Sequence, residues 1–357
     1  GPVMCRFARD GRHLANLVVE AAAVCRAADT ARRCGPGRPE TYQQWQIAVL
    51  IIITVTHRCK SKSSQYRFLT QHAPQLQGLW RKVLGLERLP SRATYMRRYR
   101  GVYELFREAI RLCGRRALQE HVADASVMAV DKSLIPARGR RPPRRPRDKW
   151  VRVDRDAGFG KSAHDGWVWG YSYEAAVAIG PRGIIVPLLA SADRANTCEC
   201  RSCLPKIPLL PPSCRYLLAD SGYDSNELGE AVEYDGQGRR TGRRLVCPLR
   251  SRGGQPRVGT QTRRGAREQR RQHRVLRERF FNSVPGRRLF RRRKQTIEPF
   301  NQWFKHLFDL EDRVWHYGLE NNRAQLLAAM FCYQLLLRYN RFCGHRDGQV
   351  NWILDAL

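Results

Sequence analysis

Three acidic side chains, each in a different local setting, are the candidates for chemistry in this sequence. Asp220 ends the apolar run that begins at Leu217 and precedes a Ser-Gly turn, as expected of a buried strand that terminates in a carboxylate. Asp131 ends a second apolar run, residues 127–130, and Glu298 lies in a helical pattern much later in the chain. Acids at the ends of neighbouring strands and on a helix above them can meet despite their separation in sequence. We therefore expect Asp131, Asp220 and Glu298 to converge.

Converging carboxylates are typical of sites for Mg²⁺, which takes hard oxygen ligands and keeps several of its waters. Two divalent ions about 4 Å apart can activate a nucleophile, stabilise a leaving oxygen and neutralise the charge of a phosphodiester. The predicted cofactor is therefore Mg²⁺ or Mn²⁺, with two ions per active site. One Asp at the end of a strand is usually a turn or cap residue, so the prediction depends on all three acids.

The net charge indicates the partner. The chain has 65 Lys and Arg against 32 Asp and Glu, a formal net charge of +33. Such self-repulsion is relieved by a polyanion, and nucleic acid fits better than an acidic membrane surface. Arg supplies 56 of the 65 basic residues, which suits phosphate recognition but also fits a genome rich in G and C.

We expect no secretory signal, and Gly1-Pro2 resembles the remnant of a removed tag. The longest aliphatic run, residues 48–55, is too short to cross a bilayer. The 12 cysteines are scattered, as expected of reduced thiols in an intracellular protein. Cys198, Cys200 and Cys203, with Cys214 as a fourth ligand, could bind zinc, although their spacing is irregular.

The first part of the chain is predicted to be helical. Apolar residues recur at helical spacing over residues 12–33, 41–55 and 91–110, and the last of these segments has a basic outer face. We predict a helix-turn-helix-like DNA-binding domain over residues 1–120. A helical bundle with a solvated basic face is the alternative. Arg38 lies in a Gly-Arg-Pro segment that resembles ligands of A·T-rich minor grooves, or is part of an ordinary linker.

The pattern changes near residue 124 to short apolar runs bounded by turns. Strands are predicted at residues 127–130, 167–178 and 184–189, followed by the strand that ends at Asp220 and another near 246–249. This order predicts an α/β fold with a ribonuclease-H-like catalytic core. We assign this catalytic domain to residues 121–345, with a basic insertion around 233–294, and a C-terminal tail to residues 346–357.

The most strongly charged stretch precedes Glu298. Residues 250–294 contain 17 Arg or Lys against two Glu. Charge runs are usually solvated surface or disorder, but this one leads into the Glu298 helix, which favours a DNA-facing arm. The residues that we predict to contact DNA are Arg38, Arg97, Arg98, Arg291, Arg292, Arg293, Lys294 and Lys305.

Five short motifs taken together carry a family resemblance. They are Ala129-Val130-Asp131-Lys132, the stretch 165–171, Arg194-Ala195-Asn196-Thr197, the stretch 218–224 and the stretch 297–305. With these motifs the chain resembles the DDE transposases of bacterial insertion sequences, in the broad IS4/IS5-like group, over residues 90–340. Lys305 fits that group's signature, whereas position 294 is Lys in place of Arg and position 291 is Arg in place of Tyr.

The resemblance implies that Asp131, Asp220 and Glu298 bind the metals and that the substrate is double-stranded DNA, both transposon ends and target. It implies cleavage by water, which frees a 3′ hydroxyl, and attack of that hydroxyl on target DNA. It also implies a homodimer on DNA in the bacterial cytoplasm, associated with the nucleoid, without a membrane or small-molecule partner. A catalytically idle DNA-binding derivative and a metal-dependent nuclease without strand transfer are the alternatives.

Overall fold

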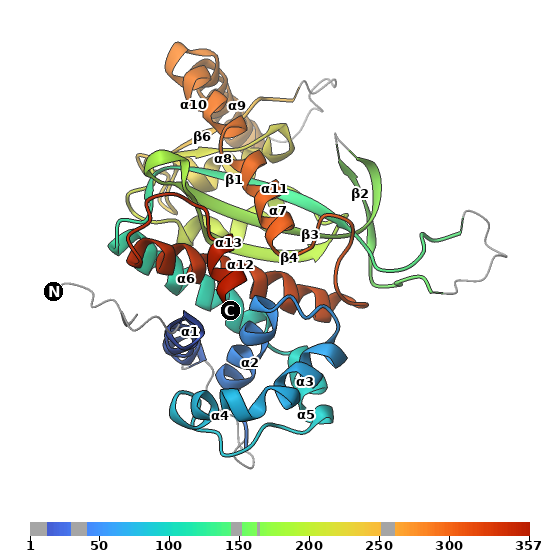
Figure 1. The fold of residues 1–357 in the computed structure, drawn as a ribbon. Coiled ribbons are helices and arrows are strands. Elements are labelled where there is room, and N and C mark those ends of the chain that lie inside the picture. The colour runs from blue at the N-terminus through green and yellow to red at the C-terminus, as the bar shows by residue number, and fades with distance from the viewer. Residues whose placement is uncertain (1–12, 30–40, 144–151, 163–164, 251–260) are drawn as a thin grey trace.

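A computed structural model describes residues 13–29, 41–143, 152–162, 165–250 and 261–357 (Figure 1). The first part is helical, as predicted. Its helices are α1 (His13–Asp29), α2 (Gln44–Thr56), α3 (Lys62–Gln71), α4 (Ala73–Lys82), α5 (Arg92–Tyr99) and α6 (Tyr103–Gln119). Every residue of α2 is buried, which explains its nearly continuous aliphatic sequence.

Two local predictions about these helices were wrong in detail. The segment 91–110 contains two helices, because the helical conformation is interrupted between Tyr99 and Tyr103. Ser91 caps the first of them by accepting a hydrogen bond from the Thr94 amide (3.2 Å). The helix predicted over residues 41–55 starts at Gln44, after the N-cap residue Gln43. The Gln43 amide donates to the side chain of Gln46 (2.7 Å), which satisfies a backbone donor at the start of the helix.

A six-stranded mixed sheet follows the helices. Its strands are β1 (Asp124–Pro136), β2 (Gly158–Ser162), β3 (Gly166–Ile179), β4 (Ile185–Arg194), β5 (Tyr216–Leu218) and β6 (Arg244–Val246). The strands β4, β3 and β1 are antiparallel neighbours, β5 pairs in parallel with β1, and β6 pairs in parallel with β5. Together with the helical region before it, this sheet confirms the predicted ribonuclease-H-like α/β fold class.

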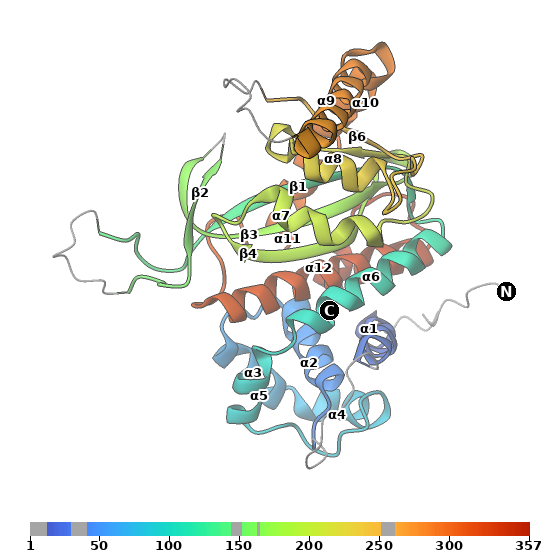
Figure 2. The same ribbon diagram turned by 180° about the vertical axis from the view of Figure 1, so that it is seen from behind.

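Helices cover both faces of the sheet. Figure 1 shows α11 (Ile297–Leu307) in front of the sheet, where it contacts β1. Figure 2 shows α7 (Glu199–Cys203) and α8 (Asn226–Glu233) on the opposite face. The face of the sheet that α11 covers is therefore the one seen in Figure 1, and α7 and α8 cover the opposite face.

The long helix α12 (Leu319–Phe342) lies between the sheet and the N-terminal helices. Every residue from Ala324 to Asn340 on α12 is buried. One hydrophobic core runs from Leu17 in α1 to Leu354 in α13 (Asn351–Ala356), so the predicted tail ends in a packed helix. The helical region and the sheet therefore share a core, and DNA binding by residues 1–120 stays a prediction.

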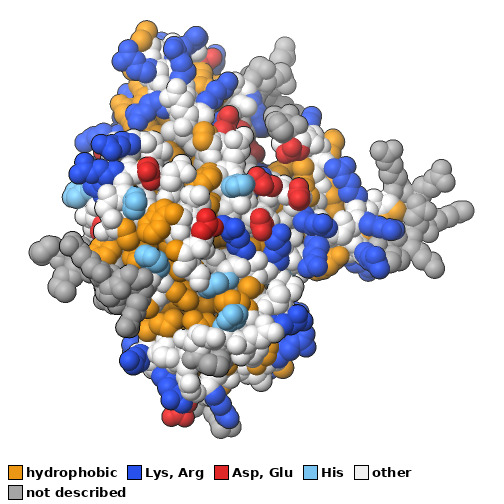
Figure 3. All heavy atoms as spheres, in the orientation of Figure 1, with side chains coloured by type: hydrophobic (Ala, Val, Ile, Leu, Met, Phe, Trp, Pro, Cys, Tyr) orange, Lys and Arg blue, Asp and Glu red, His pale blue; other side chains and the backbone are white. Residues whose placement is uncertain are grey.

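The predicted basic arm contains a helical hairpin. The helices α9 (Gln261–Asn282) and α10 (Val284–Lys294) pack against each other and project beyond the sheet (Figures 1 and 2). Figure 3 shows Lys and Arg side chains gathered at this end of the molecule. Within the parts of the chain that the structure describes, no helix combines the length and the apolar character needed to cross a membrane.

Candidate active site

The register of β1 and β5 brings two of the predicted acids together. These strands are parallel, and Ala129 is paired with Leu218. Asp131 and Asp220 each follow two residues later, so both lie just beyond the last residue pair that joins β1 and β5. Asp131 is mostly buried, with 15% of its side chain exposed, whereas 40% of the Asp220 side chain is exposed.

Glu298 comes from the first turn of α11. The buried residues Ile297, Phe300 and Phe304 anchor this helix, and Glu298 on another face is exposed. The guanidinium of Arg293 joins it to the other two acids. Its Nη2 lies 3.1 Å from Asp131 Oδ1 and 3.8 Å from Asp220 Oδ2, and its Nη1 lies 3.9 Å from Glu298 Oε1.

Further contacts fix Asp131. Asn301 lies one turn after Glu298 on α11 and donates from Nδ2 to Asp131 Oδ2 (3.1 Å), while Tyr173 donates to Asn301 Oδ1 (2.9 Å). Burial raises the pKa of Asp131 to about 7. The charge of Arg293 opposes this rise, and the neighbouring Asp220 carboxylate adds to it.

Asp220 is held by the turn that follows it. Its Oδ1 accepts a hydrogen bond from the Gly222 amide (2.7 Å). Tyr223 ends the same turn and donates to Glu174 Oε2 (3.0 Å), and Glu174 forms a buried ion pair with Lys206 (2.7 Å). The turn that orients Asp220 is thus attached to the sheet through buried polar groups.

A fourth acid, Glu199, lies beside this turn. Burial and the charge of Asp220 raise the pKa of Glu199, and its Oε1 lies 4.0 Å from Lys132 Nζ. A Cβ at position 222 would collide with the Glu199 carboxylate, so a side chain there would displace Glu199 from the turn. Lys132 Nζ also donates to the carbonyl of Thr197 (2.7 Å), which attaches the start of α7 to β1.

The predicted DNA contacts divide into two groups. Arg97, Arg291, Arg292 and Lys294 have exposed side chains. The others are engaged within the protein: Arg293 contacts the acids, Arg98 donates to Gln44 Oε1 (2.7 and 2.9 Å), and Lys305 donates to the Leu134 carbonyl (2.8 Å). Burial lowers the pKa of Lys305. Arg38 lies outside the described residues.

The three carboxylates are suitable ligands for a divalent metal, but in this structure they surround the guanidinium of Arg293. Carboxylate oxygens from three elements face one cation, and hard oxygens are the ligands that Mg²⁺ and Mn²⁺ prefer. As they stand, no three His, Cys, Asp or Glu side chains in the described part of the chain are grouped closely enough to hold a metal ion. The cysteine cluster forms no such group either, among the described residues: Cys198 is exposed, whereas Cys203 and Cys214 are buried.

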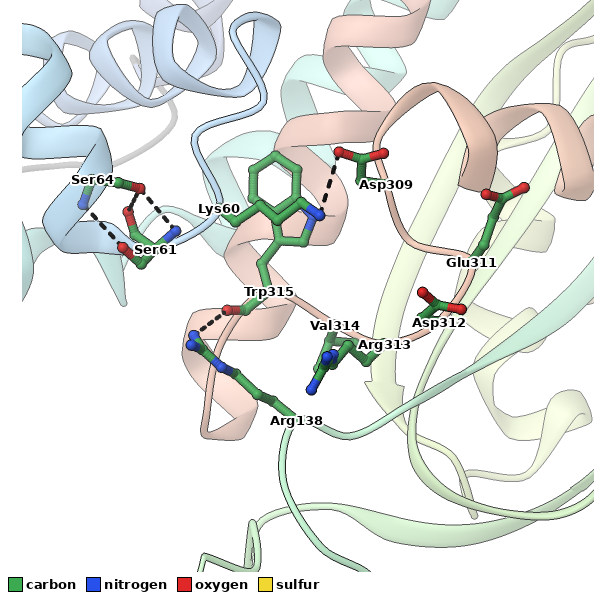
Figure 4. A pocket seen from close by; sticks show the side chains of 10 residues that line it. All are labelled: Lys60, Ser61, Ser64, Arg138, Asp309, Glu311, Asp312, Arg313, Val314 and Trp315. Atoms are coloured by element: carbon green, nitrogen blue, oxygen red, sulfur yellow. Dashed lines mark hydrogen bonds and ion pairs between the residues drawn. The ribbon is translucent and has the colours of Figure 1, made fainter.

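A cleft of about 460 Å³ lies elsewhere, between the N-terminal helices and the loop before α12 (Figure 4). Lys60 and Asp309 pair across it (3.4 Å), and Arg138 donates to the Trp315 carbonyl (3.1 Å). The residues that line it include none of the three predicted acids. We therefore place the candidate active site beside Asp131 and Asp220, just beyond the last paired residues of β1 and β5, and not in this cleft.

Sequence reasoning missed several residues of the site. Asn301 could have been found, since it lies three positions after Glu298 and so on the same helix face. Glu199 lies between Cys198 and Cys200, and nothing in the sequence indicated that it would approach Asp220. Arg293 was predicted to contact DNA, and nothing in a run of basic residues showed that this one turns inward.

Comparison with protein families matches residues 123–335 to the Transposase DDE domain. The match covers more than half of the chain, which therefore belongs to the family of proteins with a transposase DDE domain, and it includes all three predicted acids. DDE transposases generally use divalent metals. A search of curated proteins finds no match. The IS4/IS5-like grouping stays a prediction.

Proposed function

We propose that this protein is an active DNA transposase that cleaves transposon ends and joins them to target DNA. The observation that carries the proposal is the convergence of Asp131, Asp220 and Glu298, from two strands and a helix, on the single cation Arg293. Three acids brought together from separate elements are what metal-dependent phosphodiester chemistry requires.

In this proposal Asp131, Asp220 and Glu298 hold two Mg²⁺ or Mn²⁺ ions. Bound ions would supply an activated oxygen nucleophile and stabilise the leaving oxygen. Asn301 and the Gly222 amide fix one oxygen each of Asp131 and Asp220, which leaves their other oxygens for the metals. Water breaks the bond between phosphorus and the 3′ oxygen at the end of the element. The freed 3′ hydroxyl then attacks a target phosphorus and displaces its leaving oxygen.

The proposed partner is double-stranded DNA, bound as a protein homodimer that pairs two ends. Support comes from the net charge of +33 and from the exposed Arg291, Arg292 and Lys294 on α10, directly before the Glu298 helix. Phosphate contacts by such residues make binding strongly dependent on salt. The proposed setting is the bacterial nucleoid.

The first test replaces single acids. Asp220→Asn and Glu298→Gln each remove a negative charge and a metal ligand but keep the shape of the side chain. We expect DNA binding to persist and Mg²⁺-dependent cleavage of end DNA to fall by more than about 100-fold. Asp312→Asn is the matched control, since this acid lines the separate cleft and its loss should leave cleavage unchanged. Undiminished cleavage by either active-site variant would refute the proposal.

A catalytically idle DNA-binding protein is the second candidate, and one observation favours it. The guanidinium of Arg293 lies among the acids, so the site as described already holds one cation. Cleavage by the unaltered protein excludes this candidate. A precleaved DNA end then separates a transposase, which yields strand-transfer products, from a nuclease, which yields none.

A further inference from the structure

The inward position of Arg293 sets it apart from the basic residues around it. Only 9% of its surface is exposed, whereas Arg291, Arg292 and Lys294 on the same helix are exposed. It is also the residue that contacts Asp131, Asp220 and Glu298 together. Its placement is that of a counter-ion for the acids and not that of a phosphate ligand on the surface.

A guanidinium and divalent ions compete for the same oxygens. Arg cannot be deprotonated in a protein, so Arg293 cannot yield the site by losing its charge, and the side chain has to move. Its hold on the site is incomplete. The contact to Asp131 is a short ion pair of 3.1 Å, whereas the other two are 3.8 and 3.9 Å long. The buried Nε has no hydrogen-bond partner among the residues that the structure describes. Divalent ions with direct carboxylate ligands can therefore replace it.

We propose that Arg293 is a positioning residue that keeps the three acids together before metal loading and is displaced when the metals bind. This inference rests on the proposed function, because it needs the acids to be metal ligands. It makes a prediction opposite to that of a purely structural role. Removing a displaced competitor tightens metal binding, whereas removing a structural support weakens it.

The experiment titrates the full-length protein with Mn²⁺ at pH 8 in the absence of DNA, by calorimetry and by the electron paramagnetic resonance of free Mn²⁺. We expect Arg293→Gln to bind Mn²⁺ about tenfold more tightly than the unaltered protein. The control Arg292→Gln removes the same charge from the next, exposed position and should change the affinity less than about twofold. An Arg293→Gln affinity that is equal or weaker overturns the inference.

Thermal unfolding shows whether the Arg293→Gln variant is folded. Without metal, Arg293→Gln should melt below the unaltered protein, and saturating Mn²⁺ should raise its melting temperature by more. If Arg293→Gln does not fold, Arg293→Lys replaces it, because Lys keeps the charge but cannot reach three acids at once. Tighter Mn²⁺ binding by Arg293→Lys supports the inference, and unchanged or weaker binding overturns it.

Asp220→Asn separates this inference from the proposed function. If the unaltered protein and Asp220→Asn bind Mn²⁺ equally, the acids are not metal ligands and the proposed function fails along with the inference. If Asp220→Asn loses binding while Arg293→Gln gains none, the metal site stands and only the displacement of Arg293 is wrong.

Discussion

Asp131 is the acid whose surroundings change its chemistry most. Burial raises its pKa to about 7, from an ordinary value of 3.8, and the charge of Arg293 limits the rise. Because the folded-state pKa lies above the unfolded one, protonated Asp131 stabilises the fold. That contribution is complete below pH 4 and is lost as the pH rises through about 7.

Metal binding should have the opposite pH dependence, since a metal ligand has to be the carboxylate. Below about pH 7 protons compete for Asp131, so Mn²⁺ affinity should fall by up to about tenfold per pH unit and should level off at higher pH. Calorimetric titrations between pH 5.5 and 8.5 measure this. Asp131→Asn should lose the binding itself, and a flat profile for the unaltered protein would show that Asp131 is not a ligand.

Among the elements, the turn after β5 depends on a buried polar network. Lys206 Nζ contacts Glu174 Oε1 at 2.7 Å and also donates to the Ser202 carbonyl (2.9 Å), while Tyr223 donates to the other Glu174 oxygen. Lys206 and Glu174 are 3% and 2% exposed. The network connects β3, the segment after α7 and the turn that carries Asp220.

Breaking this pair on one side should be costly. Lys206→Met leaves a buried carboxylate without its cation, so we expect the free energy of unfolding to fall by about 3–5 kcal/mol. Urea denaturation measures the change. The double variant Lys206→Met with Glu174→Gln should recover part of the loss, because the stranded charge is gone. A Lys206→Met protein of unaltered stability would show that the pair is dispensable.

The elements that could be predicted are those with a strong local pattern. The helix of Glu298 follows from Ile297, Phe300 and Phe304, and β3 from a long apolar and aromatic run. The strand β2 was missed because Gly158 and Gly160 weaken the strand pattern. The site divides in the same way. Asp220 follows the end of β5, as predicted, whereas β1 continues past Asp131 to Pro136 and does not end there. The inward turn of one Arg among many depends on packing that a charge run does not encode.

At the scale of the whole molecule, a buried ion cluster joins the N-terminal helices to α12. Arg338 donates to Glu20 Oε1 on α1 (2.8 Å) and to Glu120 Oε2 at the end of α6 (2.8 Å). Arg338 and Glu20 are almost fully buried, and Arg116 also contacts Glu20. The cluster lies within the hydrophobic core that the helices and the sheet share.

Arg338→Met tests whether the molecule unfolds as one unit. Removing the cation leaves Glu120 without its ion-pair partner and leaves Glu20 with Arg116 alone, and we expect the free energy of unfolding to fall by about 3–5 kcal/mol. Because the core is continuous, amide hydrogen exchange should accelerate in both α1 and β3. Faster exchange confined to the N-terminal helices would indicate that they open independently of the sheet. Arg346→Met, at an exposed position, is the matched control.

The pairing of β5 with β1 limits which mutations in this part of the chain can leave Asp220 correctly oriented. This strand has only three residues, yet its alignment of Leu218 with Ala129 decides which way Asp220 faces. Side chains alternate along a strand, so a slip of one position would turn Asp220 toward the opposite side. Because β5 and β6 are the shortest strands of the sheet, with three residues each, the orientation of Asp220 has little margin for misalignment.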